Sequence, residues 1–296
     1  MDFVPAKRDD SRSHFQTVLA KKYAAYLTDI DGTITPAGSP DIPEFLFEAI
    51  ARTAAKVPFG VCTAQNLSRS LQKFAPLFEK TKALGYDLQS SLILICENGG
   101  MGYFFDTEKE RYEEFYRVDF PFSSDERQHI FTELELAAGE LLGTSLLNEV
   151  SLIFRPSPAP DPIILAKKSR ALALVLLEKM KSVGLRDKLE IGDSGIGVTI
   201  FSREANKDHG TREFAKLLKQ RRGVDVSELA SEIIVVGNRP DPLGNDESFL
   251  NGKYGTPFTV GEIHPEHFLP LPVFGDDGTI KMGPEGSLEL MNKLVF

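Results

Sequence analysis

The chain has 296 residues, of which 42% are hydrophobic and 26% charged, and its formal net charge at pH 7 is -9. This composition is that of an ordinary soluble globular protein, long enough for one large domain or two smaller ones. The negative charge excludes a general nucleic-acid binder, which needs a basic surface, but it permits a local basic pocket for a small phosphorylated ligand.

The sequence also argues against a membrane-bound or secreted protein. No apolar run approaches transmembrane length, and Asp2, Asp9 and Asp10 stand where a signal peptide needs an apolar core. Cys62 and Cys96 each end an apolar run, which indicates buried thiols in a reducing compartment rather than a disulfide. We therefore expect a cytoplasmic protein without a membrane partner, whose oligomeric state the sequence leaves open.

The first third of the chain predicts alternating strands and helices. Residues 1–13 are polar and predict a loose arm, which a short helical stretch around Phe15 and Leu19 follows. Short apolar runs then alternate with segments whose apolar residues recur at helical spacing. This alternation predicts a Rossmann-like parallel sheet covered by helices on both faces. The predicted elements are a strand from residue 23, a helix at 43–55, a strand at 57–62, a helix at 67–78 and a strand at 91–96.

The pattern changes between residues 118 and 203, which we interpret as an inserted α+β domain within a core formed by 1–117 and 204–296. Just before it, Asn98-Gly99 and the aromatic residues 103–105 predict a hairpin. The predicted elements of the insertion are a helix at 125–142, a strand at 150–154, a helix at 163–183 and strands near 189–191 and 196–201. The core then resumes with a helix at 210–220, a strand at 232–236, a loop at 237–246, a strand at 255–260 and a C-terminal helix that turns Leu288, Met291 and Leu294 inward.

Two carboxylates, Asp29 and Asp31, follow the first predicted strand. Side chains two residues apart in an extended strand point to the same side, and the break at Gly32 lets both reach one small volume. Two anions at so short a distance repel each other, and a bound divalent cation is the usual way to neutralise them. One carboxylate can then attack phosphorus while the other moves a proton. The structural alternative is a simple turn after a strand, which Asp and Gly favour.

Other polar residues follow the remaining strands. Ligands of open α/β sheets bind outside the carboxyl ends of the strands, so we expect Thr63, Asn98 and the loop at 237–241 to converge there with Lys207, which precedes the helix at 210–220. A carboxylate, a hydroxyl, an ammonium and further oxygen ligands suit phosphoryl transfer, in which positioning and charge neutralisation dominate catalysis. A dehydrogenase would carry glycines after the first strand, and these are missing.

These residues resemble the four motifs of the haloacid dehalogenase-like phosphohydrolases. The matching positions are Asp29-Ile30-Asp31-Gly32-Thr33, then Thr63, then Lys207, and finally the Gly-Asn and Asn-Asp pairs of the loop at 237–246. The insertion lies where that superfamily's IIB subfamily carries its C2-type cap. The resemblance covers the chain from about residue 23 onward and implies a Rossmann-like core with an inserted α+β cap domain.

The resemblance also implies roles for individual residues. Asp29 is the expected nucleophile and a Mg²⁺ ligand, and Asp31 is the expected general acid and base, which also offers its backbone carbonyl to the metal. Thr63 and Lys207 are expected to bind the phosphoryl oxygens. Three further residues are expected to bind substrate: Asn98, the cap residue Arg155, and Ala64, the residue after Thr63.

The metal loop departs from the family. Gly237 is followed by Asn238 instead of the usual aspartate, which keeps a carbonyl oxygen but removes one negative charge and should weaken Mg²⁺ binding. We carry over Asn238 and Asp246 as expected metal ligands, with Asp241 in reserve. A catalytically poor member of the family is therefore a further interpretation.

Several stretches are also similar to eukaryotic-type phosphomannomutases. They are Asp31 to Ala37, Glu97-Asn98-Gly99, Val150 to Arg155 and Leu243 to Glu247. Arg155 matches an arginine that binds the sugar's second phosphate in those enzymes. However, Gly38 replaces another phosphate-binding arginine, Thr199 replaces an acidic residue that binds sugar hydroxyls, and Thr63 replaces the mutase glycine. These departures favour hydrolysis over mutase chemistry.

Simpler structural roles stay open for most of these residues. Thr63 could cap a helix together with Asn66, Lys207 could be an ordinary helix-start lysine, and Arg155 could be a solvated edge residue. The glycine-rich stretch 192–197 predicts a hairpin rather than a nucleotide site, and His264 and His267 alone do not predict a metal site.

The sequence thus favours a Mg²⁺-dependent phosphatase acting on a phosphorylated sugar or similar small metabolite through an aspartyl-phosphate. The alternatives are a phosphosugar mutase and a non-catalytic sensor of a phosphorylated ligand, the latter motivated by Asn238.

Overall fold

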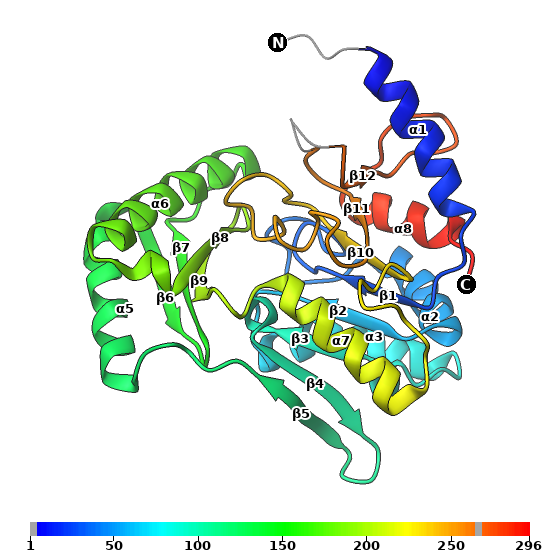
Figure 1. Cartoon of the computed structure of the whole chain (residues 1–296), viewed down its shortest axis with the longest axis horizontal. Coiled ribbons are helices and arrows are strands. Elements are labelled where there is room, and N and C mark those ends of the chain that lie inside the picture. Colours follow the sequence, from blue (N-terminus) through cyan, green and yellow to red (C-terminus); the bar gives the residue numbers. More distant parts are fainter. Residues whose placement is uncertain (1–4, 264–267) are drawn as a thin grey trace.

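The computed structural model describes residues 5–263 and 268–296, which contain one sheet of eight strands and one of four (Figure 1). The larger sheet belongs to the core, and the smaller one lies beside it with two long helices on its outer face. The fold class predicted from the sequence, a mostly parallel core sheet with an inserted α+β cap domain, is confirmed.

The core sheet has the strand order β12-β11-β10-β1-β2-β3-β4-β5, and all neighbours from β12 to β3 are parallel. Each central strand is a short apolar run that is buried on both faces, as a parallel sheet between helices requires. The parallel strands are β1 (Ala25–Thr28), β2 (Phe59–Cys62), β3 (Ile93–Cys96), β10 (Ile233–Gly237), β11 (Thr256–Thr259) and β12 (Leu271–Pro272).

Consecutive side chains of β1 enter opposite cores. Tyr26 stacks on Phe59 and belongs to the apolar cluster on one face, whereas Leu27 joins Phe214 on the other face. The first face is covered by α2 (Phe47–Lys56), α3 (Leu67–Ala83) and α8 (Gly283–Lys293), and the second by α7 (Lys207–Arg222). Cys62 and Cys96 are buried free thiols, as predicted.

The first helix is longer than the sequence predicted. Helix α1 spans Pro5–Leu19, so residues 5–13 form a helix where a loose arm was expected. Pro5 suits the first turn of a helix, and the following Ala6, Lys7 and Arg8 are good helix formers without needing an apolar face. Its C-terminal turns are anchored by Phe15, Val18 and Leu19, which are buried. Residues 1–4 of the predicted arm lie outside the described part of the chain.

The edge of the core sheet is antiparallel. The short helix α4 (Leu88–Ser91) precedes β3, and residues 97–100 join β3 to β4 (Met101–Asp106), which pairs with β5 (Arg111–Arg117). The predicted hairpin at Asn98-Gly99 is therefore confirmed. Glu97 and Asn98 both have positive φ angles, of 50° and 60°.

The cap has its own hydrophobic core between its sheet and its helices. Its strand order is β6-β7-β9-β8, and its elements are α5 (Ser124–Ala138), β6 (Leu142–Leu147), β7 (Ser151–Pro156), α6 (Pro162–Ser182), β8 (Leu189–Asp193) and β9 (Val198–Ser202). Strand β6 was not predicted, because the sequence pattern ran the preceding helix on to residue 142. Gly139, whose φ is 52°, ends that helix. Residues 192–197 form the β8–β9 hairpin, as predicted.

Backbone hydrogen bonds tie the cap to the core above the sheet. Asp193 donates its N–H to Leu243 and accepts from Asn245, so β8 forms a short bridge with the loop after β10. This contact places the β8–β9 turn over the carboxyl ends of the core strands. No helix among residues 5–263 and 268–296 is long and apolar enough to cross a bilayer.

Candidate active site

The carboxyl ends of β1 and β2, the loop after β10 and the start of α7 meet under the cap. Asp29, Asp31 and Thr63 line a small cavity of about 30 Å³ there, together with Arg155 from the cap. The strands bring these residues together because their parallel register aligns Thr28 with both Val61 and Val236. Of the residues expected to converge here, Thr63 lines the cavity with Asp29 and Asp31, and Lys207 contacts Asp29.

The loop that follows β1 turns tightly around Gly32. The Asp29 N–H donates to the carbonyl of Val236, which extends the β1–β10 pairing by one residue. Gly32 has a φ of 78°, and a Cβ there would come 2.3 Å from the side-chain amide of Asn238. Glycine is thus required both by the backbone conformation and by the close approach of Asn238.

Lys207 is the centre of a buried ion cluster. Its Nζ lies 2.8 Å from Asp29 Oδ1 and 2.5 Å from Asp246 Oδ1, and all three side chains are almost fully buried. The sequence placed Lys207 before the helix, whereas α7 begins at Lys207, with Asn206 as its N-cap. A lysine at a helix N-terminus opposes the helix dipole, and the two carboxylates compensate for it. Burial opposes the charge of Lys207, but Asp246 and Asp29 outweigh it and hold its pKa above the ordinary value.

Asp29 has one engaged and one free oxygen. Burial raises its pKa to about 7, against the attraction of Lys207, while Asp246 and Asp31 add to the rise. Oδ1 accepts from Lys207, whereas Oδ2 is buried and has no hydrogen-bond partner among the described residues. An unpartnered buried carboxylate oxygen is costly, so this oxygen is positioned for a ligand.

Asp31 is held by two residues that the sequence reasoning missed. Gln65 Nε2 donates to Asp31 Oδ2 at 2.6 Å, and Lys73 Nζ donates to Asp31 Oδ1 at 2.6 Å. Lys73 is almost buried on the face of α3 that also carries Ser70, Phe74 and Leu77. A lysine on the buried face of a helix needs an anionic partner. The position of Lys73 among the apolar residues of α3 could therefore have marked it as a candidate site residue.

The other residues predicted after the core strands take different positions. Thr63 and Ala64 line the small cavity, and Thr63 Oγ1 accepts from the Gln65 N–H. Asn98 is fully buried, and its N–H donates to the Thr63 carbonyl. Its side chain does not line this cavity, so the structure gives Asn98 a place behind Thr63 rather than a direct contact with the cavity.

The loop after β10 is organised by Asp246. Asp246 Oδ2 accepts from the N–H groups of Asn238 and Arg239, and its Oδ1 accepts from Lys207. Both oxygens are thus already engaged, which does not fit the predicted role as a direct metal ligand. Asp241 pairs with Arg170 and Arg239, so its carboxylate is already engaged by two cations, and its expected compensation for the charge missing at Asn238 stays a prediction.

The cap contributes Arg155 and Thr199 to the small cavity. Arg155 lies on β7 and is half-buried, and no hydrogen bond or ion pair engages its guanidinium within the described residues. Burial and the neighbouring Arg69 lower its pKa, while Asp31 raises it. A guanidinium in this position is available to an anionic ligand.

Three buried acceptors around the small cavity have no partner among the described residues. They are Asp29 Oδ2, Gln65 Oε1 and Asn245 Oδ1, and all three residues line the cavity. Buried polar atoms in folded proteins are almost always satisfied. Their grouping at one cavity indicates a ligand that supplies hydrogen-bond donors or a cation.

The oxygen donors suit a hard cation only in part. No three His, Cys, Asp or Glu side chains in the described ranges approach closely enough to hold a metal ion. The amide of Asn238 faces the Asp31 carbonyl and Asp246 Oδ2; its nitrogen, turned toward them, donates at 3.1 and 3.3 Å. With its oxygen turned there instead, it accepts from Thr33 and faces the Asp31 carbonyl oxygen. Asp29 Oδ2, the Asp31 carbonyl and the Asn238 oxygen are then the available donors.

Comparison with known proteins supports the fold. No protein-family model matches the sequence, and no curated protein matches it. The structure resembles an IMP-bound mutant of Plasmodium falciparum IMP-nucleotidase, with 14% identity and a TM-score of 0.64 over 93% of this chain and 67% of that chain. It also resembles the C-terminal domain of C. albicans trehalose-6-phosphate phosphatase, with 13% identity and a TM-score of 0.62 over 97% and 94%. At these identities the likeness is one of fold.

Proposed function

We propose that this chain is a haloacid dehalogenase-like phosphohydrolase that hydrolyses a small phosphomonoester through Asp29. One observation carries the proposal: Asp29 is buried against Lys207 through one oxygen, and its other oxygen is free at the ligand-binding edge of the sheet. The shared fold with a nucleotidase and a sugar-phosphate phosphatase is consistent with this class of reaction.

In the first step, Asp29 Oδ2 attacks phosphorus and forms an aspartyl-phosphate while the bond from phosphorus to the ester oxygen breaks. Asp31 gives its proton to the departing oxygen. In the second step, Asp31 takes a proton from water, the water oxygen attacks phosphorus, and the bond to Asp29 breaks to release inorganic phosphate. Lys207 and Thr63 stabilise the charge on the phosphoryl oxygens.

Gln65 and Lys73 give Asp31 a fixed orientation between these steps. They hold its two carboxylate oxygens at 2.6 Å each. We assign Asp246 a positioning role as well, because it orients both Lys207 and the backbone of the loop that carries Asn238. Lys73 and Asp246 act on the reaction through Asp31 and Lys207, whereas Gln65 both orients Asp31 and lines the small cavity.

Mg²⁺ is the cofactor of this proposal. The Asp29 carboxylate, the Asp31 carbonyl and the Asn238 side-chain oxygen would hold it, with water as further ligands. A bound Mg²⁺ would neutralise charge on Asp29 and on the phosphoryl group. Asn238 supplies no charge, so we expect weaker binding than an aspartate at this position would give.

The cap has to move for substrate to enter. The cavity at Asp29 measures about 30 Å³, which accommodates only about two water molecules. Closure of the cap over a bound phosphoryl group would exclude bulk water and bring Arg155 to the substrate.

A non-catalytic sensor of phosphorylated ligands remains the second candidate, and Asn238 is the observation that favours it. Its amide nitrogen can satisfy the Asp31 carbonyl and Asp246 without any metal. A mutase has less support, because Gly38 and Thr199 lack the side chains that would bind a second phosphate and sugar hydroxyls.

The test is inorganic phosphate release from a panel of phosphomonoesters, compared between wild type and Asp29→Asn with and without Mg²⁺. The proposal predicts release that requires both Asp29 and Mg²⁺. No release by the folded wild-type protein, together with binding of a phosphorylated compound, would contradict it in favour of the sensor. Interconversion of sugar phosphates without net release would indicate the mutase.

A further inference from the structure

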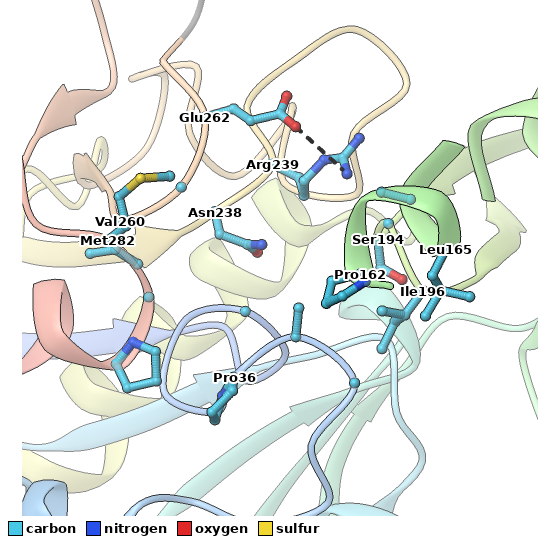
Figure 2. Close-up of a pocket in the computed structure, with 18 of the residues that line it drawn as sticks. Pro36, Pro162, Leu165, Ser194, Ile196, Asn238, Arg239, Val260, Glu262 and Met282 are labelled. Carbon is cyan, nitrogen blue, oxygen red and sulfur yellow. Dashed lines mark ion pairs between the residues drawn. The ribbon is translucent and has the colours of Figure 1, made fainter. Parts of the chain in front are cut away.

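A second, much larger cavity lies beside the candidate active site. It has a volume of about 520 Å³ and is bounded by the loop after β1, the loops at 238–239 and 260–262, the start of α8 and the cap (Figure 2). Figure 2 shows Pro36 and Met282 on the core side and Pro162, Leu165 and Ile196 on the cap side, with Asn238 between them. Among the described residues that line this cavity, Asn238 is the only one with a role in the proposed reaction.

This cavity adjoins the small one at Asp29. Ser194 and Ile196, in the β8–β9 turn, line both cavities. Gly32 and Asn238, next to the nucleophile loop, line the larger cavity as well. The small cavity holds only about two water molecules, so it has no room for the organic part of a phosphomonoester. The larger cavity shares Ser194 and Ile196 with the small one and is large enough for that part of the substrate.

The walls of the larger cavity are mainly apolar. Among the described residues that line it, only Ser194, Asn238, Arg239 and Glu262 have polar side chains; the others are glycine, proline, methionine or aliphatic residues. Ser194 Oγ already donates to the Gly197 carbonyl, and the Asn238 amide is engaged with the nucleophile loop. A ligand with many hydroxyl groups would lose hydrogen bonds to water here without replacing them.

Charge also limits what the cavity can take. Arg239 lies within ion-pair distance of Asp193, Asp241 and Glu262, with nitrogen–oxygen distances of 3.4, 3.1 and 3.8 Å. Three carboxylates already compensate its guanidinium, so it offers little attraction to a second phosphate. Glu262, whose side chain is 55% exposed, adds an acceptor that suits an N–H or O–H group of the ligand.

We propose that this cavity binds the organic group of the substrate, and that this group is a neutral aromatic or heterocyclic ring with few polar substituents. The inference rests on the proposed function and narrows it, because it disfavours both a bisphosphate and a plain hexose phosphate. The phosphoryl group would lie at Asp29 in the small cavity and the ring in the larger one, with the turn at Ser194 and Ile196 between them.

Cavity-filling variants test this assignment. Ala166→Phe narrows the cavity from the cap and Met282→Trp from the core, and neither residue takes part in the proposed chemistry. Leu174→Phe is the matched control on α6, because Leu174 is an exposed residue that does not line the cavity. Phenyl phosphate is the ring-bearing probe, methyl phosphate the ringless one, and glucose 6-phosphate the hydroxyl-rich one.

Binding of each probe is measured calorimetrically with the Asp29→Asn protein, which does not depend on turnover. We expect phenyl phosphate to bind about tenfold tighter than methyl phosphate or glucose 6-phosphate, and each filling variant to remove about tenfold of that affinity. Methyl phosphate binding and the Leu174→Phe control should stay unchanged. Equal affinities for the three probes, or equal losses for the ring-bearing and ringless probes, would overturn the inference.

The wild-type background separates this inference from the proposed function. Turnover of acetyl phosphate requires the reaction site but no ring subsite. Acetyl phosphate hydrolysis that proceeds while phenyl phosphate hydrolysis is insensitive to both filling variants would overturn the cavity assignment alone. Absence of hydrolysis with ring-selective binding intact would overturn the phosphatase and leave the cavity assignment standing.

Discussion

The ammonium group of Lys207 lies 2.8 Å from Asp29 Oδ1, and less than a twentieth of either side chain is exposed. The pair joins the first residue after β1 to the first residue of α7, which are 178 positions apart. The cap insertion lies between them in the sequence. The nucleophile and its cation therefore become neighbours only when the core segments before and after the cap pack against each other. The buried charge cluster is therefore both a feature of the site and a condition of the fold.

Removing the cation should destabilise the protein strongly. Lys207→Met leaves Asp29 and Asp246 buried without their shared partner, which we expect to lower the free energy of unfolding by about 3–5 kcal/mol. Urea unfolding at neutral pH measures this. Lys219→Met, on the exposed face of the same helix, is the control and should cost less than about 0.5 kcal/mol. Equal effects of the two substitutions would contradict the assigned ion cluster.

The raised pKa of Asp29 should appear in the pH dependence of stability of the metal-free protein. Its pKa is about 7 in the folded state against an ordinary 3.8, so the folded protein binds this proton more tightly than the unfolded chain. The resulting stabilisation is present at low pH and is lost as the pH rises toward 7. Asp29→Asn lacks this loss.

Relative to wild type, Asp29→Asn should therefore become progressively more stable between about pH 4 and pH 7, by at most about 1.4 kcal/mol per pH unit. Urea unfolding in a chelating buffer across this range checks the slope. A difference between the two proteins that stays constant or falls with pH would show that Asp29 is ionised throughout.

Asn238→Asp should exchange metal-free stability for metal affinity. A further carboxylate beside Asp29 and Asp246 repels them when no cation is present, and it binds Mg²⁺ better when one is. We expect the metal-free variant to lose about 1 kcal/mol, or roughly 2–4 °C in Tm, and its Mg²⁺-dependent rise in Tm to exceed that of wild type. The control is Asn292→Asp, at an exposed site. An unchanged response to Mg²⁺ would place the metal elsewhere.

The buried carboxylate of Asp193 should hold the cap on the core. It accepts from Ser169 and the Gly195 N–H, and its other oxygen pairs with Arg170 and Arg239. Asp193→Asn keeps the shape but removes the charge between the two arginines, at a cost of about 1–3 kcal/mol. Hydrogen exchange should quicken at residues 193–197 and 239–246.

The matched control is Asp187→Asn, at an exposed position in the cap, which should leave exchange in both segments unchanged. Faster exchange throughout the cap in Asp193→Asn, without a local maximum at these segments, would instead indicate a general loss of cap stability.

The core could be predicted because its strands are short apolar runs that alternate with amphipathic helices. That pattern also located Asp29, Thr63 and Lys207, since parallel strands present their carboxyl ends at one edge. Strand β6 was missed because Leu142–Leu147 is half-exposed and because the predicted helix ran through Gly139, where the helix ends in the structure.

Contacts between distant segments could not be predicted in the same way. Nothing local to Lys73 or Gln65 identifies Asp31 as their partner. Likewise, nothing in the sequence of the loop predicts that Asp241 pairs with Arg170 and Arg239. Asp246 matches a family motif, but whether its oxygens face a metal or the protein depends on the path of the loop at 238–246. These are properties of the packed structure rather than of any one stretch of sequence.

The central claim is that Asp29 becomes covalently phosphorylated, and trapping of the acyl phosphate tests it most directly. Asp31→Asn should slow hydrolysis of the intermediate, whereas acetyl phosphate needs little help from an acid to leave. After reaction with acetyl phosphate and Mg²⁺, borohydride reduction should convert residue 29 to homoserine, which mass spectrometry of the peptide identifies. Homoserine at position 29 is the predicted result. Unmodified Asp29 in a preparation whose wild-type counterpart releases phosphate would contradict the account.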